Sequence, residues 1–495
     1  MAFNSLTYFL FLPLIWIVYQ LTPDRLRWLL LLAASLGFYA MLKAPYLLVV
    51  LGLVAGVTYS VGVRLGRCSD DTGRKRLLWI GVGANLLVLI SLKYLPAVFS
   101  DFHLSPFTFD LSRFYSPFTH HFSLLITIGI SYYVFQAISY LADIYLEIID
   151  PEPHFGYLFL SLAFFPKLLQ GPIERSGGLL PQLKKPYVFD YDMARSGLIL
   201  FAWGLFKKVV VADRLALYVN TVYGDVHTYT GLPLILATYC YAFQIYYDFS
   251  GYTDMALGSA RLFNINLTQN FNSPYLATSV ADFWRRWHIS FSRWILDYIF
   301  KPLQMSWRDW GTAGTAAALL VTFLVSGIWH GASWGFVVWG VLHGVYLAAS
   351  VYYRPWQKKI HKALGIEKTK LLKIWQTVVT FNLVCFAWIF FRADSLQDAF
   401  YLVNHALRGI GTTLLPLFSS FGSLRAGKGL LKPIFLDMQY ELFIVIVVIL
   451  ISFPLARLMN RNRFTPRYAS YLILILIIVL FGYFTNTGNF IYTRF

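Results

Sequence analysis

Long apolar runs recur along this chain, and their length limits what it can fold into. Typical runs cover residues 47–63, 77–92, 334–350, 440–451 and 471–484. Several reach the roughly 17–25 residues that a helix needs to cross a bilayer, and aromatic flanks extend the shorter ones. The runs lack the polar–apolar alternation of strands in a lipid-facing barrel. We therefore expect an all-α, polytopic integral membrane protein with about ten to twelve transmembrane or re-entrant helices.

The composition agrees with a membrane protein. Charged residues make up 13% of the chain, against about 25% in soluble proteins. The net charge of +17 would suggest nucleic acid in a soluble protein, but here we assign it to cytoplasmic loops beside anionic head groups and expect no nucleic-acid partner. Cys68, Cys240 and Cys385 are too few and too scattered for a disulfide framework or a metal site, and we interpret Cys240 and Cys385 as small core residues.

Basic loops give an expected orientation. Lys and Arg gather at 64–76, 354–373 and 457–467, which we place in the cytoplasm, whereas 99–121 has one Arg and no Lys and is placed outside. Both termini then lie outside. No basic segment precedes the first apolar run, which favours a retained first helix over a cleaved signal peptide. We treat residues 1–495 as one membrane domain whose motif-bearing core covers about 122–350.

The middle of the chain predicts a cavity. Between residues 160 and 345 the apolar segments are short and broken. Broken helices at membrane depth are tolerated only where they are buried in protein or line a cavity.

The segment 281–300 plots as one amphipathic helix, suited to the cytoplasmic membrane interface. We expect i,i+4 ion pairs between Asp282 and Arg286 and between Arg293 and Asp297. Its arginines can attract the phosphates of a nucleotide-linked thioester or an acidic carrier protein, and contact with lipid head groups alone is the alternative. The polar face holds Asp282, Arg285, Arg286, Ser290, Arg293 and Asp297, and the apolar face holds Trp284, Trp287, Phe291, Trp294 and Tyr298.

Two histidines at membrane depth are the candidate catalytic residues. His288 lies at the edge of the apolar face of 281–300, and His330 lies between Gly327 and Gly331. Ionisable groups inside a membrane are functional-site candidates by default, and imidazole exchanges protons near neutral pH. The glycines let backbone or a linear ligand approach closely. The structural alternatives are a snorkelling side chain for His288 and a buried, backbone-bonded imidazole for His330.

Other polar residues have less specific patterns. Asp248 and Asp254 lie among hydroxyl-bearing residues, where they are suited to capping a helix start at a break or to binding a cation. Two carboxylates are too few for a dedicated metal cage, so we expect no metal. We interpret His343 as a packed or supporting residue.

Four segments are specific in combination: QIYYDFSGYTDM at 244–255, NFNSPY at 270–275, DFWRRWHIS at 282–290 and GIWHG at 327–331. With them, the chain resembles the membrane-bound O-acyltransferase family, in its bacterial branch that acetylates alginate and other polysaccharides. Further matching segments lie at 165–175, 180–183, 204–214 and 490–495. The sequence departs from the family pattern in two places. Leu296 replaces an Arg, and 304–309 occupies the region of an absent Gly-Gly-Asn-Arg stretch, so Arg293 or Arg308 is a candidate for the missing charge.

The resemblance implies a helical ring around a central tunnel in a bacterial plasma membrane. Acetyl-coenzyme A or another acyl thioester enters from the cytoplasm as co-substrate, with no bound cofactor. The acyl group leaves to an extracytoplasmic polysaccharide or to a partner acetyltransferase that relays it. The resemblance gives His330 the catalytic role and His288 a supporting one. Within the matching motifs we expect donor contacts from Arg285, Arg286, Trp329, Asp248 and Asn270.

This chemistry is physically consistent with a buried histidine. Transfer from a thioester to a hydroxyl needs a base and a means to stabilise the developing oxyanion. Burial disfavours the charged imidazole, so a histidine in a dry tunnel stays available as a base. Neither histidine adjoins a usual Cys or Ser nucleophile motif, so direct transfer is simpler than a covalent intermediate.

Two other classes of function stay open from the sequence. A transporter or flippase would use His288 and His330 as a proton relay. A non-catalytic scaffold would only dock a secreted acetyltransferase. Flux without loss of thioester would indicate the transporter, and tolerance of His330→Ala would indicate the scaffold.

Overall fold

The computed structural model describes residues 2–42, 44, 46–94, 129–411, 434–459 and 464–484. In these ranges the chain forms helices and no strands, which confirms the all-α class. Five of the described helices are long and apolar enough to cross a membrane, and three shorter apolar helices accompany them. The expected ten to twelve segments and the ring with its tunnel stay predictions. The loop 99–121 and the segment 490–495 lie outside the described residues.

The chain divides into two compact units. The first comprises Met1–Gly204 and Tyr252–Asn270, and the second comprises Leu205–Gly251 and Phe271–Gly488. Helix α14, Leu232–Arg261, contributes residues to both. The expectation of one membrane domain, with a core at about 122–350, stays a prediction.

The first unit packs its helices around an apolar cluster formed by α3, α8, α9 and α11, with Tyr140 and Leu158 fully buried. Helix α4 approaches α8 closely, because a Cβ on Gly81 would lie only 2.6 Å from the Leu141 side chain. Asp70 caps the start of α4 by accepting a hydrogen bond from the Gly73 amide. The helices of this unit are α1 (Leu6–Leu21), α2 (Asp24–Ala40), α3 (Tyr46–Arg67), α4 (Asp71–Lys93), α8 (Ile130–Tyr145), α9 (Phe155–Ala163), α10 (Phe165–Leu168), α11 (Ser176–Lys184) and most of α12 (Tyr191–Phe206).

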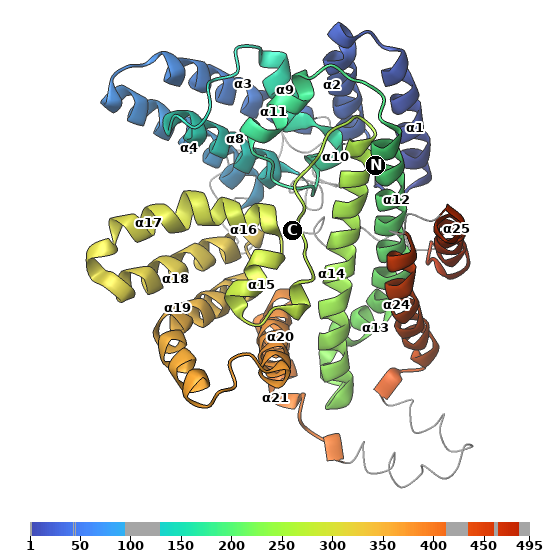
Figure 1. The fold of residues 1–495 in the computed structure, drawn as a ribbon. Coiled ribbons are helices and arrows are strands. Elements are labelled where there is room, and N and C mark those ends of the chain that lie inside the picture. The colour runs from blue at the N-terminus through green and yellow to red at the C-terminus, as the bar shows by residue number, and fades with distance from the viewer. Residues whose placement is uncertain are drawn as a thin grey trace, which may run out of the picture. The chain divides into compact units, whose positions relative to one another are not determined.

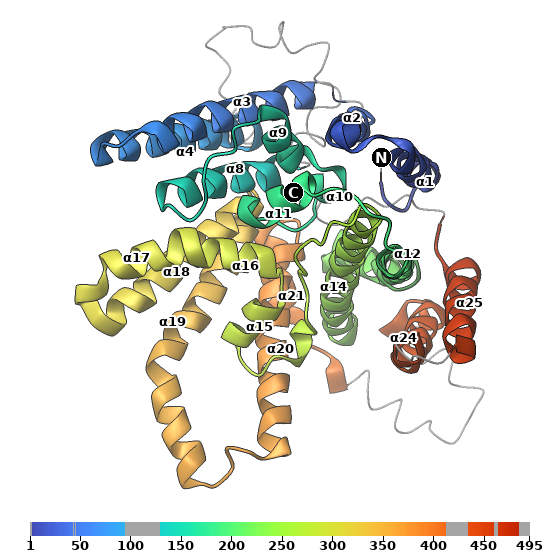
Figure 2. The ribbon, with the colours of Figure 1, turned by 45° about the horizontal axis from the view of Figure 1, so that its top comes forward.

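The second unit carries the histidine motifs. Short helices α15 (Val280–Arg286), α16 (Ile289–Ile295) and α17 (Lys301–Ser306) precede the long α18 (Gly311–His330), α19 (Trp334–Ala363) and α20 (Lys370–Arg392) (Figures 1 and 2). The broken segments expected in the middle of the chain are therefore present. The unit also contains the π-helical turns η2 (Lys207–Ala212) and η5 (Leu296–Phe300), the 3₁₀ turns η3 (Val226–Thr228), η4 (Pro274–Leu276) and η6 (Arg308–Trp310), and helices α13 (Asp213–Gly224), α21 (Leu396–His405), α24 (Gln439–Met459) and α25 (Phe464–Phe481).

Helices α18 and α19 form a hairpin whose backbones touch at glycines. A Cβ on Gly327 would lie 2.4 Å from the Phe336 carbonyl oxygen, and a Cβ on Gly340 would lie 2.4 Å from that of Phe323. Small residues permit such approach between apolar helices. Of the two uses expected for Gly327, the close approach of backbone is confirmed. This contact fixes the end of α18, where His330 lies, against the start of α19.

Candidate functional site

His330 is the last residue of α18 and is 3% exposed. The ring centroid of His330 lies 4.9 Å from that of Trp339, at 90°, and 5.1 Å from that of Phe391. Trp339 belongs to α19 and Phe391 to α20, so three helices of the second unit enclose the imidazole. Its position follows from the Gly327 contact less than one turn earlier in α18.

His288 lies at a break between two short helices, where the sequence predicts one continuous helix over 281–300. That prediction is wrong: α15 ends at Arg286, and His288 takes a left-handed conformation with φ 43° and ψ 56° before α16 begins. The break buries Trp287 and His288 together, each 1% exposed. In one continuous helix these two successive side chains would point about 100° apart. Packing of Trp287 against Phe271, with ring centroids 5.1 Å apart, therefore takes precedence over the helical pattern of the sequence.

The burial of His288 also excludes a snorkelling side chain, which would keep its polar end in water. Burial lowers the pKa of the His288 imidazole to about 3, so this imidazole is neutral at physiological pH. A neutral imidazole can accept or donate a hydrogen bond but cannot serve as a fixed cation for the donor's phosphates.

The structure brings the two histidines to one aromatic cluster. Phe291 stacks on Trp329 with ring centroids 4.4 Å apart, and both rings lie beside both histidines. The Phe291 centroid is 5.1 Å from that of His288 and 6.1 Å from that of His330. The Trp329 centroid is 6.3 Å from His288 and 4.7 Å from His330. The sequence places Trp329 beside His330, whereas its stacking on Phe291 joins two segments about 40 residues apart.

His343 is a packed residue, as the sequence predicts. It is fully buried, and its Nδ1 accepts a hydrogen bond of 3.2 Å from the Trp284 indole N–H. Its ring lies 5.1 Å from that of Trp339, on which His330 also packs. The bond from Trp284 links α15 to α19 behind the histidine cluster.

Asp248 and Asp254 lie inside the continuous helix α14, so neither caps a helix start at a break, and that interpretation is wrong. The Asp248 carboxylate instead accepts a hydrogen bond of 2.6 Å from Nζ of Lys208, with both side chains buried. A contact between Asp248 and a donor stays a prediction. Asn270 is buried but belongs to the first unit, so its expected donor contact stays a prediction as well.

The arginines between residues 282 and 297 differ in whether they form an ion pair. Asp282 accepts hydrogen bonds from Arg286, at 3.0 Å, and from Arg285, at 3.3 Å, which confirms the expected Asp282–Arg286 pair. Burial alone would raise the pKa of Asp282, but these bonds outweigh it and hold the pKa below its ordinary value. The expected Arg293–Asp297 pair is wrong, because Asp297 pairs with Lys301 at 2.8 Å. Arg293 makes no ion pair with any residue in the described ranges.

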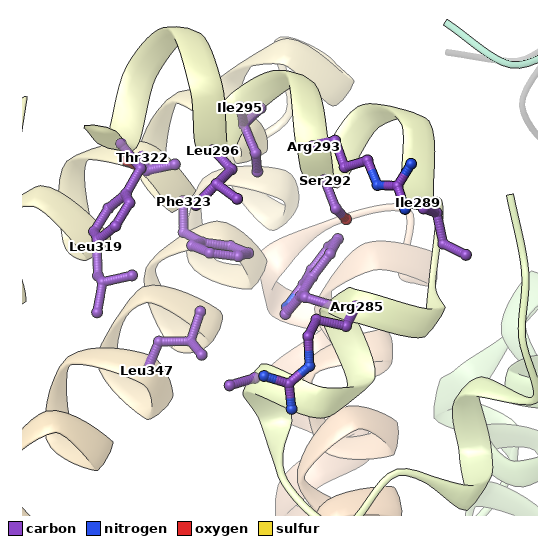
Figure 3. A pocket seen from close by; sticks show the side chains of 13 residues that line it. Arg285, Ile289, Ser292, Arg293, Ile295, Leu296, Leu319, Thr322, Phe323 and Leu347 are labelled. Carbon is purple, nitrogen blue, oxygen red and sulfur yellow. The ribbon is translucent and has the colours of Figure 1, made fainter. Parts of the chain in front are cut away.

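A cavity of about 430 Å³ lies among α15, α16, η5, α18 and α19, where the sequence predicts one. Figure 3 shows Arg285 and Arg293 on one side of it, with Leu319, Phe323 and Leu347 on the other. Leu296, one of the departures from the family pattern, is part of its wall. Arg286 and Arg308 do not line it. The lining residues are Ala281, Trp284, Arg285, Ile289, Ser292, Arg293, Ile295, Leu296, Phe300, Leu319, Thr322, Phe323 and Leu347.

Known proteins are similar in sequence to most of this chain, including the segment that holds the two histidines and the cavity. The family model for membrane-bound O-acyltransferases (MBOAT) matches residues 152–391, which include both histidines. A probable alginate O-acetylase from Azotobacter vinelandii is 36% identical over 81% of this chain and 76% of its own length. The chain belongs to the MBOAT family. It is therefore an O-acyltransferase of a family of multi-pass membrane proteins.

Other relatives in the MBOAT family have names that refer to different polymers. A peptidoglycan O-acetyltransferase from Helicobacter pylori is 31% identical over 94% of this chain and 91% of its own length. A teichoic acid D-alanyltransferase from Bacillus subtilis is 26% identical over 56% of this chain and 71% of its own length. The alginate-acetylating branch expected from the motifs is thus supported over most of the chain.

Proposed function

We propose that this protein transfers an acyl group, most simply acetyl, from a cytoplasmic thioester to hydroxyls outside the bacterial plasma membrane. The acceptor is an extracytoplasmic polysaccharide, or a partner protein that relays the acyl group to one. The observation that carries the proposal is the burial of two histidines from separate motifs around one stacked pair, Phe291 and Trp329. The names of the relatives support acetyl, because the two relatives with the larger coverage are both named for O-acetyl transfer.

His330 acts as the base in this proposal. Its imidazole takes the proton from the acceptor hydroxyl while that oxygen attacks the thioester carbonyl carbon. The C–S bond then breaks, and the proton passes from the imidazolium to the leaving thiolate. Rings of Trp339 and Phe391 pack around His330 and keep water away from its imidazole.

His288 has the supporting role. Its neutral ring shares Phe291 and Trp329 with His330, so a change at His288 reaches the base through two packed side chains. Through this position His288 and Trp329 orient the donor or the base. A donor contact from Asn270 rests on the family motif alone.

The cavity beside α16 is the proposed donor site. Its volume of about 430 Å³ falls within the range of small-molecule pockets. Arg285 and Arg293 supply positive charge for phosphates, and the leucine and phenylalanine wall suits the apolar part of a thioester. Ile289, which lines this cavity, directly follows His288 in the chain. Arg286, turned toward Asp282, supports the site by helping to hold α15.

The test is acyl transfer by purified protein in lipid nanodiscs, with thiol release and acylated polysaccharide measured together. His330→Ala should lower the rate by about 10²–10⁴-fold, the usual cost of losing a general base. His361→Ala, at the far end of α19, is the matched control and should leave the rate unchanged. Transfer by His330→Ala within a few-fold of wild type would contradict the base assignment. Movement of an acylated substrate without thiol release would indicate a transporter.

A further inference from the structure

A buried cluster of one lysine and two aspartates lies in the second unit, apart from the histidines. Nζ of Lys208 is 2.6 Å from Oδ1 of Asp248 and 2.9 Å from Oδ1 of Asp213. The side chains are 2%, 3% and 10% exposed for Lys208, Asp248 and Asp213. The mechanism above uses none of these charges.

Such a cluster is costly in a membrane protein. Each charge loses its hydration on burial, and an ion pair recovers that loss only when its geometry is good. Charged residues retained inside membrane proteins therefore mark functional positions more often than structural ones. Lys208 also lies in the π-helical turn η2, an irregularity that is frequent at functional sites.

The cluster is connected to His288 through the next residue of α14. Phe249 follows Asp248, and its ring centroid lies 4.8 Å from that of His288 at an angle of 82°. Phe249 also meets Phe271 at 5.1 Å, and Phe271 packs on Trp287 at the helix break. Because neighbouring residues of a helix are fixed about 100° apart, the bond that holds Asp248 also sets the direction of Phe249.

His288 depends on this support more than an ordinary helical residue does. Its left-handed backbone is a conformation that residues other than glycine rarely adopt, and it persists only when surrounding contacts enforce it. Phe291 stacks on one side of the ring at 5.1 Å, and Phe249 meets the ring edge-on. Loss of either contact would let the chain at 287–288 relax.

We propose that Lys208 is a positioning residue for acyl transfer, acting through Asp248. It holds α14 in the rotation that places Phe249 against His288, and so keeps that imidazole beside Phe291 and Trp329. The catalytic part of this inference rests on the proposed function, whereas the placement of His288 by Lys208 does not.

A double-mutant cycle tests the inference. Asp248→Asn keeps the side-chain shape and removes the charge that binds Lys208. We expect a loss of roughly tenfold in kcat in the wild-type background, a coupling of ordinary size for residues in contact. In a His288→Ala background the same change should cost less than about twofold, because the group being positioned is gone. An equal loss in both backgrounds would show that the cluster is only structural.

The matched control is Glu441→Gln. Glu441 pairs with Arg214 on α13, the helix that carries Asp213. Its effect on kcat should be small and equal in both backgrounds.

A second measurement does not need activity. Diethyl pyrocarbonate modifies neutral imidazoles that it can reach, and mass spectrometry locates the product. His288 should be protected in wild type and in Glu441→Gln, and modified at least about fivefold faster in Asp248→Asn and in Phe249→Ala. Unchanged protection in both of those variants would overturn the inference. Because this readout is independent of His330, it separates failure of the positioning role from failure of the proposed function.

Discussion

Replacing Gly327 by alanine should move His330, the proposed base, without changing that residue. The added Cβ would lie 2.4 Å from the Phe336 carbonyl oxygen and 3.2 Å from Cα of Gly340. Ordinary contact begins at 3.4 Å, so α18 and α19 must separate by about 1 Å at this point. The obstacle is backbone, and no side-chain rotation can relieve it.

The size of the effect follows from the position of His330. It lies three residues after Gly327, less than one turn along the same helix, so the displacement reaches it almost undiminished. A shift of about 1 Å at a reacting group can cost about 10²-fold in rate. The accompanying overpacking costs about 1–3 kcal/mol of stability, offset in part by the better helix propensity of alanine. We therefore expect folded protein with kcat lowered by about two orders of magnitude.

The assay is acyl transfer in nanodiscs, with thermal unfolding measured on the same samples. Gly83→Ala in α4 is the control, because a Cβ there meets nothing within 4 Å. That control should keep full activity. Gly327→Ala with kcat within about threefold of wild type, in folded protein, would refute the argument that the glycine contact positions His330.

Two further predictions concern the cavity and His288. Arg293→Glu should raise the apparent KM for the donor by about three- to tenfold. The difference in KM from wild type should become smaller at high salt, because screening weakens both the attraction of Arg293 for the donor's phosphates and the repulsion by the new carboxylate. Arg308→Glu is the control, because that side chain is 82% exposed and does not line the cavity. An unchanged KM for Arg293→Glu would indicate that the arginines only contact lipid head groups. Burial lowers the pKa of His288 to about 3 from an ordinary 6.5, so the unfolded chain binds a proton between these values that the folded protein does not. Stability should therefore fall as pH drops below about 6.5, and His288→Phe should reduce that fall in thermal melts at about pH 7 and pH 5.

The sequence predicts the helical class and the two histidines because both depend on local information. Apolar runs of membrane length form helices wherever they lie, and His330 follows one of them directly. The Asp282–Arg286 pair likewise needs only the i,i+4 spacing of one helical turn. The resemblance of the motifs to the family adds the expected roles of the two histidines, which their residue types alone do not reveal.

What the sequence mispredicts depends on partners distant in the chain. The pattern of 281–300 fits one amphipathic helix, but Trp287 is buried among Phe271 and Trp388, and the helix breaks to allow it. The partner of Asp248 is Lys208, 40 residues earlier, and no local pattern joins them. Arg293 lines the cavity together with residues of α18 and α19, which follow it in the chain, whereas Arg286 donates a hydrogen bond to Asp282.

These departures from local rules all lie in the second unit. A left-handed histidine, a buried lysine on a π-helical turn and a second π-helical turn at 296–300 would each lower the stability of an ordinary helical bundle. Sequences tend to agree with their structures at every level except where function requires otherwise. The irregular turn at 207–212 places Lys208 on Asp248, the break at His288 places its ring on Phe291, and the turn at 296–300 places Leu296 in the cavity wall. Because two of these irregularities place residues in the proposed site and the third places the lysine that we propose positions His288, making these segments regular should stabilise the fold and remove the activity together.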